Sequence, residues 1–135
     1  MSRVFALASL WVFMGTSPLL HAQDEESGSV IAYATYFYCT TAGESRADEI
    51  IRSSFKPHYD QAVEQNQISS WSWLQHYFGG KWRRVLVIVT TNMESALETS
   101  GALGEIVSET TPEAGRAFSE ICSSHDDYIL SLIHI

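Results

Sequence analysis

The side chains best suited to chemistry lie in one aromatic-rich stretch, ISSWSWLQHYFGGKWRRVLVIVTT, which spans residues 68–91. His76 stands between Leu74 and Phe78 in strand-like alternation, and Arg83 is predicted to lie opposite it. An imidazole in an apolar cavity beside a cation can stay neutral and act as a base or a ligand donor. His76 and Arg83 are therefore the candidate catalytic residues. The alternative is a core histidine bonded to a backbone carbonyl, with an arginine at the sheet edge that pairs with an acid or reaches solvent.

Arg84 and the aromatic residues of the same stretch are candidate ligand-binding residues. Alternation predicts that Arg83 and Arg84 point to opposite faces of one strand, so that one of them faces the helices or a cavity. Such an arginine can hold a carboxylate or an enolate through two parallel hydrogen bonds. Four aromatic side chains are predicted to share a face and to offer a flat wall to a planar ligand: Trp71, Trp73, Tyr77 and Trp82. Ordinary packing on a sheet is the alternative for these aromatic residues.

A second group of polar side chains, at 124–128, contains nitrogen and oxygen atoms that could bind a metal. His125 and Asp127 lie on one side only if this segment is extended. No HExxH motif and no pair of histidines two residues apart accompanies them, so no metal is predicted, and the acids are expected to cap the last strand. The sequence has no P-loop, nucleophile elbow or dinucleotide fingerprint, so no cofactor is predicted. A haem would need His76 or His58 as its axial ligand.

The pair Gly79-Gly80 separates two β-favouring runs and predicts the hairpin that carries the candidate residues. Two adjacent glycines supply the positive φ angles of a tight turn that matches the twist of the strands. A two-residue loop sets the register as Tyr77 opposite Trp82, Gln75 opposite Arg84, Trp73 opposite Leu86 and Trp71 opposite Ile88. Both faces of this hairpin carry large apolar side chains, so we expect both faces to be covered.

Hydrophobic periodicity predicts the elements around this hairpin. Strands are expected near residues 30–40, 68–79, 81–91 and from 126, and helices near 46–66, 92–109 and 112–122. Pro57 lacks a backbone donor and predicts a kink or a break within the first helix. The order is the β-α-β-β-α-β unit of a ferredoxin-like α+β sandwich, in which the helices cover one face of a four-stranded antiparallel sheet.

With this order of elements and an apolar second sheet face, residues 30–129 resemble the dimeric α+β barrel superfamily. The resemblance rests on the element order, the hairpin and the sheet composition, and no motif selects one branch. In that superfamily two ferredoxin-like units place their sheets face to face, which implies a homodimer joined through the open sheet face. Its members include small monooxygenases, haem-degrading enzymes and isomerases, so the fold does not name a reaction.

The two ends of the chain are predicted to lie outside this domain. Residues 1–22 have a positive charge at Arg3, an apolar run and a small residue, Ala22, before a cleavage site, as in a signal peptide. Residues 23–29 are predicted to form a flexible polar lead-in. The last six residues, LSLIHI at 130–135, resemble a translated sequencing adaptor. The alternative for these six residues is a genuine C-terminal strand.

Export to the periplasm or beyond the cell makes a disulfide the predicted state of the two cysteines. In the split unit the first and last strands are antiparallel neighbours. Cys39 ends the first of these strands, and Cys122 comes just before the last. Cross-linking a loop of about 84 residues would stabilise the fold by roughly 4 kcal/mol on the chain-entropy model. A pair of buried free thiols is the alternative.

Composition limits the partners. The formal net charge is −8, and the predicted leader contains an arginine but no acid, so the mature chain is more acidic still. Nucleic acid and, after cleavage of the leader, membranes are therefore not expected as partners. We expect an exported domain that binds an apolar or aromatic small molecule in a sheet cavity, either without chemistry or with cofactor-independent oxidation or isomerisation. Whether it is an enzyme stays open. The second hypothesis is a non-catalytic structural or partner-binding subunit that uses the open sheet face.

Overall fold

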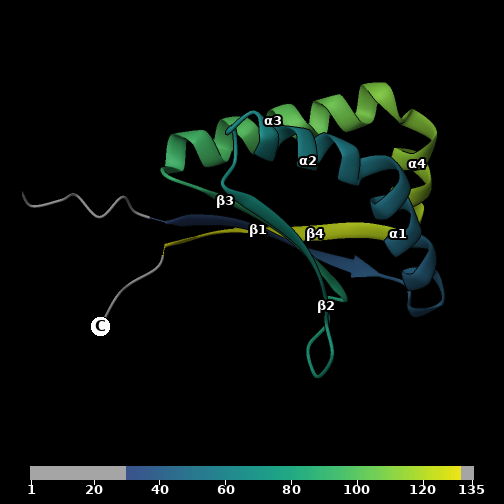
Figure 1. Ribbon diagram of the computed structural model, residues 1–135. Coiled ribbons are helices and arrows are strands. Elements are labelled where there is room, and N and C mark those ends of the chain that lie inside the picture. The colour runs from purple at the N-terminus through teal and green to yellow at the C-terminus, as the bar shows by residue number, and fades with distance from the viewer. Residues whose placement is uncertain (1–29, 132–135) are drawn as a thin grey trace, which may run out of the picture.

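The computed structural model describes residues 30–131 as one four-stranded antiparallel sheet with helices on one side (Figure 1). The strands are β1 (Ile31–Cys39), β2 (Ser70–Gln75), β3 (Arg84–Thr90) and β4 (Cys122–Ser131). The helices are α1 (Glu44–Ile50), α2 (Lys56–Glu64), α3 (Met93–Thr110) and α4 (Pro112–Ile121), with a 3-10 turn η1 (Thr41–Gly43) and a π-helical turn η2 (Ile51–Phe55). The sheet order is β2-β3-β1-β4, which confirms the predicted ferredoxin-like α+β class.

Strand alternation divides the sheet side chains between a helix-covered face and an open face. On the helix-covered face Leu86 of β3 belongs to the hydrophobic core together with Phe55 and Phe118 from the helical layer, and the partly buried Phe37 of β1 packs against this core. On the open face the neighbouring positions are also apolar, with Val85 directly opposite Tyr36 of β1. Because both faces of the sheet are apolar, the core alone does not account for the sheet composition.

The first helical stretch runs without a break over residues 44–64, close to the predicted 46–66. The disturbance expected at Pro57 takes the form of the π-helical turn η2, which comes just before it. Pro57 then lies in the first turn of α2, directly after the wider turn, which accommodates its missing backbone N–H. The wider turn keeps Ile51 and Tyr59 buried on the same core.

The hairpin between β2 and β3 has the predicted register but a longer loop. The residue pairs are Trp71 with Ile88, Trp73 with Leu86, and Gln75 with Arg84. The ladder stops there, and the predicted pairing of Tyr77 with Trp82 is wrong. Residues 76–83 instead form a loop that projects from the sheet, at the bottom of Figure 1. Gly79 and Gly80 adopt φ angles of 76° and 71°, so the turn lies where the two glycines predict it.

Strand β4 begins at Cys122 and not near the predicted residue 126. It pairs with β1 as far as Ser131, which lies opposite Ile31. The prediction of a loop at 123–126, with acids that cap the last strand, is wrong. This segment is extended, because β1 offers hydrogen-bonding groups along its whole length. Residues 130–131 continue this strand. The predicted signal peptide and lead-in, and the rest of the predicted adaptor-derived tail, lie outside the described residues.

A disulfide joins Cys39 to Cys122, as predicted. The two residues lie opposite each other at the irregular end of the β1–β4 ladder, with their Cα atoms 3.9 Å apart. They are separated by 83 residues, so the bond closes a loop that contains most of the domain. Because α4 ends at the residue before Cys122, the disulfide also fixes the C-terminal end of α4 to β1.

Candidate functional site

His76 lies in the loop between β2 and β3, so the prediction that it lies within a strand is wrong. Its Nδ1 lies 2.6 Å from the carbonyl oxygen of Trp82, and its Nε2 lies 2.5 Å from that of Phe78. Its ring also stacks on Trp82 with 4.0 Å between the centroids. Both ring nitrogens therefore lie against backbone carbonyl oxygens, and a nitrogen that carries the proton donates to its carbonyl, as in the alternative interpretation. These contacts replace the strand pairing that a two-residue hairpin would make.

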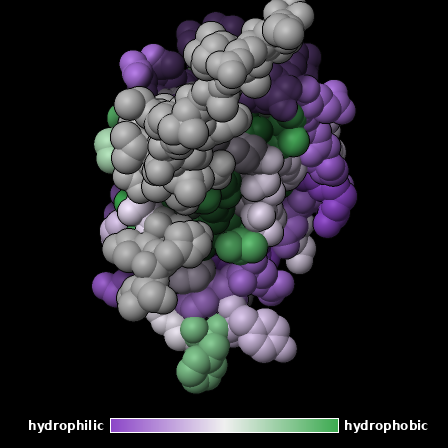
Figure 2. Space-filling model, turned by 60° about the vertical axis from the view of Figure 1, so that its left-hand side comes forward, coloured by the Kyte–Doolittle hydropathy of each residue, from purple (hydrophilic) through white to green (hydrophobic). Residues whose placement is uncertain are grey.

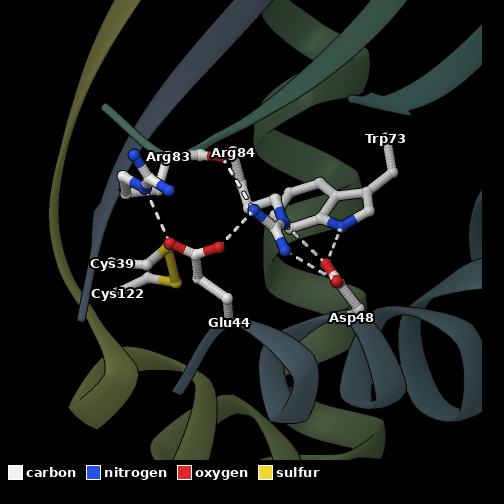
Figure 3. The surroundings of a disulfide bond; sticks show 7 residues. All are labelled: Cys39, Glu44, Asp48, Trp73, Arg83, Arg84 and Cys122. Carbon is white, nitrogen blue, oxygen red and sulfur yellow. Dashed lines mark hydrogen bonds and ion pairs between the residues drawn. A yellow bond between two sulfur atoms is a disulfide. The ribbon is translucent and has the colours of Figure 1, made fainter. Parts of the chain in front are cut away.

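Arg83 and Arg84 do not point to opposite faces, because both bind Glu44 of α1 (Figure 3). Arg83 donates from Nε to one carboxylate oxygen at 2.6 Å, and Arg84 donates from Nη1 to the other at 3.0 Å. Arg84 also makes a forked pair with Asp48, from Nε at 2.7 Å and from Nη2 at 2.8 Å. Arg83 precedes β3, so strand alternation does not govern its direction. The carboxylate that the arginines were predicted to hold is thus supplied by the chain itself.

We call these four charged residues the ion-pair cluster. Arg84 and Glu44 are buried at its centre, and Arg83 and Asp48 are partly exposed at its sides. Arg84 is only 2% exposed. Arg83 and Arg84 hold the pKa of Glu44 below its usual value, and Arg84 does the same for Asp48 with help from the indole of Trp73. Hydrogen bonding to Asp48 raises the pKa of Arg84 in turn. A buried ion pair recovers its lost hydration only when its donors and acceptors are satisfied, as they are here.

Trp71 and Trp73 share the helix-covered face of β2, as predicted for these two. Their indole N–H groups donate to Asp60 at 3.0 Å and to Asp48 at 2.8 Å, respectively. Together they line a hollow of about 320 Å³ beside α1, η2 and the start of α2, whose wall also contains Arg52. Because each indole N–H is bound to a carboxylate, hydrogen bonds as well as packing hold the two tryptophans in place.

The other two members of the predicted aromatic wall lie elsewhere, so the prediction of one shared face is wrong. Tyr77 is 95% exposed at the loop tip. Trp82 packs edge-on against Tyr36 of the open face, with 4.9 Å between the ring centroids. Both residues follow the end of the β2–β3 ladder, where the two-residue period no longer applies.

A larger apolar cleft of about 740 Å³ lies between α3, α4 and the sheet. Its floor contains Phe37 and Leu86 of the sheet, Phe55 and Tyr59 line the side of η2 and α2, and Phe118 comes from α4. This volume is typical of sites for small molecules, which are mostly apolar with a few polar groups. None of the site residues proposed from the sequence lines this cleft.

Besides Tyr59, three ionisable side chains line the cleft: Arg116 and Glu120 of α4, and His125 of β4. The Nε2 atom of His125 lies 3.4 Å from Oδ2 of Asp127, and its ring packs against Phe37 at 5.6 Å between centroids. The extended strand places His125 and Asp127 on one side, as expected for an extended segment. Because its side chain is 52% exposed, His125 lies where the apolar lining meets solvent.

Two tyrosines near the cleft stay protonated at neutral pH. Burial raises the pKa of Tyr59 to about 12. Burial, aided by the negative charge of Asp127, raises the pKa of Tyr33 against an opposing hydrogen bond from Ser100. Both hydroxyls can therefore donate a hydrogen bond but cannot act as bases, which leaves His125 as the better proton acceptor at the cleft.

The cleft residues were missed by the sequence analysis because Phe37 and Phe118 have the pattern of ordinary core positions. One usable signal was present in the helices. Gly104 and Gly115 both line the cleft from helix interiors, where glycine costs about 1 kcal/mol relative to alanine. A Cβ added at either glycine would meet nothing within 4 Å, so these positions face open space. His125 was considered only as a metal ligand.

The open face of the sheet carries a row of aromatic side chains and exposed apolar residues. Tyr36 contacts Tyr128 of β4 edge-on at 5.3 Å, on the side away from Trp82. Leu74 is 47% exposed and Leu130 is 46% exposed. Figure 2 shows apolar side chains between polar flanks, and again at the tip of the loop that projects at the bottom. Apolar residues at this density are typical of an interaction surface.

The sheet order and the single helical layer place the chain in the ferredoxin-like class of α+β proteins. No protein-family model matches the sequence, and the search of curated proteins gave no significant match. No helix within residues 30–131 is long and apolar enough to cross a membrane.

Several solved structures are similar to the chain. A NIPSNAP family protein from Agrobacterium tumefaciens strain C58 superposes with a TM-score of 0.60 at 11% identity, over 77% of this chain and 86% of that protein. A dimeric ferredoxin-like protein from an uncultured marine organism gives 0.55 at 10% identity, over 79% and 97%. An ethyl tert-butyl ether D family protein from Bacillus halodurans C-125 gives 0.50 at 10% identity, over 78% and 99%. These similarities show the fold and assign no function.

Proposed function

We propose that the chain is an exported protein that binds an apolar or aromatic small molecule in the cleft between α3, α4 and the sheet. The observation that carries this proposal is the 740 Å³ apolar cleft with three ionisable groups at its edge. The Cys39–Cys122 disulfide supports maturation in an oxidising compartment, periplasmic or extracellular. The bound molecule is either carried unchanged or converted without a cofactor, by isomerisation or oxidation.

Two glycines of α3 provide a matched test of the cleft. Gly104 lines it and Gly101 does not, and a Cβ at either meets nothing within 4 Å. We expect Gly104→Leu to fill the cleft and weaken the binding of nitrobenzene, measured by calorimetry, by about tenfold or more. Gly101→Leu should leave the affinity unchanged. Both variants should keep or raise the melting temperature, because glycine is the poorer helix former.

If nitrobenzene binds both variants equally well, or if neither nitrobenzene nor any other probe named for this protein binds the wild-type chain, the cleft is not a binding site. A parallel screen with haem, a flavin and a quinone on the wild-type protein and on Gly104→Leu would then narrow the ligand class. Loss of a retained ligand in Gly104→Leu alone would place that ligand in the cleft.

We also propose that the mature protein is a homodimer joined through the open sheet face. The half-exposed Leu74, Tyr128 and Leu130 on this face support a second copy as its partner. The similar marine protein is itself described as dimeric. Light scattering should give a dimer for the wild-type chain and a monomer for Leu74→Glu. Leu97→Glu is the control, because Leu97 is similarly exposed, at 52%, but lies on α3 in the helical layer.

A non-catalytic, partner-binding role is the second candidate function. The observation that favours it is the loop tip, where Tyr77 and Phe78 are 95% and 94% exposed. Two large aromatic groups at full exposure are typical of residues that become buried in a complex. The dimer would then use the open face, while the loop tip meets a different chain. A protein that dimerises but binds no aromatic probe in the cleft would favour this role.

A further inference from the structure

One imidazole stands at the edge of the cleft. His125 lies at its edge, with the carboxylate of Asp127 beside Nε2 at 3.4 Å. A carboxylate on one side of an imidazole orients the ring and stabilises it when it gains a proton. Within residues 30–131, the other ring nitrogen, Nδ1, makes no hydrogen bond to the protein. That nitrogen is therefore the one available to a ligand.

The remaining charged and titratable groups around His125 favour an anion beside it. Arg116 and Glu120 line the same cleft from α4, Asp127 lies on the same strand as His125, β1 contributes the uncharged Phe37, and the protonated Tyr33 lies beside Asp127. Within the described chain Arg116 has no carboxylate partner within 4 Å. A ligand anion at Nδ1 would thus lie near one free guanidinium and one newly formed imidazolium. Asp127 balances the imidazolium from its far side.

We propose that His125, positioned by Asp127, is the recognition group for ligands that carry an acidic hydroxyl, namely phenols or enols with an apolar body. The hydroxyl proton moves to Nδ1, the electron pair stays on the ligand oxygen, and an imidazolium–phenolate pair results. The exchange needs no oxidant or metal. Returned to a carbon of an enolate, the same proton completes a keto–enol isomerisation. This inference rests on the cleft being a binding site, as proposed above.

Two probes that differ by one hydroxyl test the inference: 4-nitrophenol, whose absorbance distinguishes phenol from phenolate, and nitrobenzene. We expect the wild-type protein to bind 4-nitrophenol about tenfold more tightly than nitrobenzene, because a hydrogen bond between charged groups is worth that much. The bound fraction should absorb as phenolate at a pH where free 4-nitrophenol is still mostly protonated.

His125→Phe should remove the tenfold preference and the phenolate absorbance, with nitrobenzene binding unchanged. Asp127→Asn should keep nitrobenzene binding and reduce the phenolate fraction, because its role is to position the imidazole. The matched control is His58→Phe, which removes another exposed histidine that contacts Thr110 and does not line the cleft. That control should behave like the wild-type protein with both probes.

The outcomes separate the two proposals. Equal affinities for both probes, or a phenolate signal that survives His125→Phe, would overturn the role of His125 and leave the cleft as a binding site. Failure of both probes to bind would overturn the binding site and the role of His125 with it. Because His125 is half exposed, His125→Phe should keep the melting temperature, and this can be checked on the same samples.

Discussion

The ion-pair cluster and the cleft lie on the same side of the sheet and contain the same kinds of side chain, but they differ in how those side chains are satisfied. Arg84 has two carboxylate partners and is 2% exposed. His125 has a single longer contact to Asp127, and its side chain is 52% exposed. The first environment stabilises the fold, because its charged groups are bound to one another. The second leaves a donor or acceptor next to an apolar hollow, as a binding site requires.

The largest expected effect of a single substitution is on the ion-pair cluster. Arg84→Met should lower the free energy of unfolding by about 3–5 kcal/mol, because it leaves the buried carboxylate of Glu44 and the partly exposed carboxylate of Asp48 with fewer partners. Arg46→Met is the matched control. It removes an arginine paired with Glu49 at 60% exposure, where about 1 kcal/mol or less is expected. Urea unfolding of both variants measures the difference, and equal losses would show that the cluster is not a structural unit.

The disulfide should have the next largest effect. Replacing both Cys39 and Cys122 by alanine should cost about 2–4 kcal/mol of unfolding free energy, because the reduced chain gains a long flexible loop when it unfolds. Reductant should destabilise the wild-type protein by a similar amount and leave the double variant unchanged. A wild-type protein whose stability does not respond to reductant would mean that the two thiols are not bonded in solution.

A smaller effect is expected at acid pH. The pKa values of Glu44 and Asp48 are lowered in the folded state by the arginines, so their contribution to stability is complete above the unfolded-state values, near about 4. It is lost as the pH falls further, through the lowered folded-state values. Urea midpoints measured from neutral pH downward should therefore drop below about pH 4. The drop should be shallower in Arg84→Met, and an identical slope in both proteins would contradict this origin.

The smallest effect is expected at the cleft. Arg116→Ala should change the unfolding free energy by no more than about 0.5 kcal/mol, because an exposed side chain without a partner contributes little. In the same measurement Gly104→Ala should stabilise by about 0.5–1 kcal/mol through helix propensity. A large loss from either substitution would show that the cleft wall is packed more tightly than its lining suggests.

The same contrast explains what the sequence could predict. The element order follows from hydrophobic periodicity. The register of Trp73 with Leu86 follows from the two glycines of the turn. The Cys39–Cys122 disulfide follows from the topology of the fold. The directions of Arg83 and Trp82 were predicted wrongly, because side chains alternate between the two faces of a sheet only where the strands are paired, and both residues lie beyond the paired part of the hairpin.

The cleft itself could not be predicted, because its shape depends on how α4 packs against α3 and the sheet. Phe37 and Phe118 contact each other at 5.1 Å between centroids and look like any core pair in the sequence. The role of His125 depends on that same packing, since only the position of α4 makes β4 one edge of a cleft. Only the glycines within the two helices indicated open space beside them. A glycine in a helix is equally consistent with a void and with a close approach of another backbone, so it does not by itself predict a cleft.

The position of Cys122 has a consequence for the order in which the molecule is built. During synthesis β1, the hairpin and α3 emerge before α4 and β4, so the sheet can form three strands before its last edge exists. The wall formed by α4 is fastened only after Cys122 reaches Cys39, across 83 residues. The cleft is therefore the last part of the domain to be completed, because its wall and its edge strand both come from the final third of the chain.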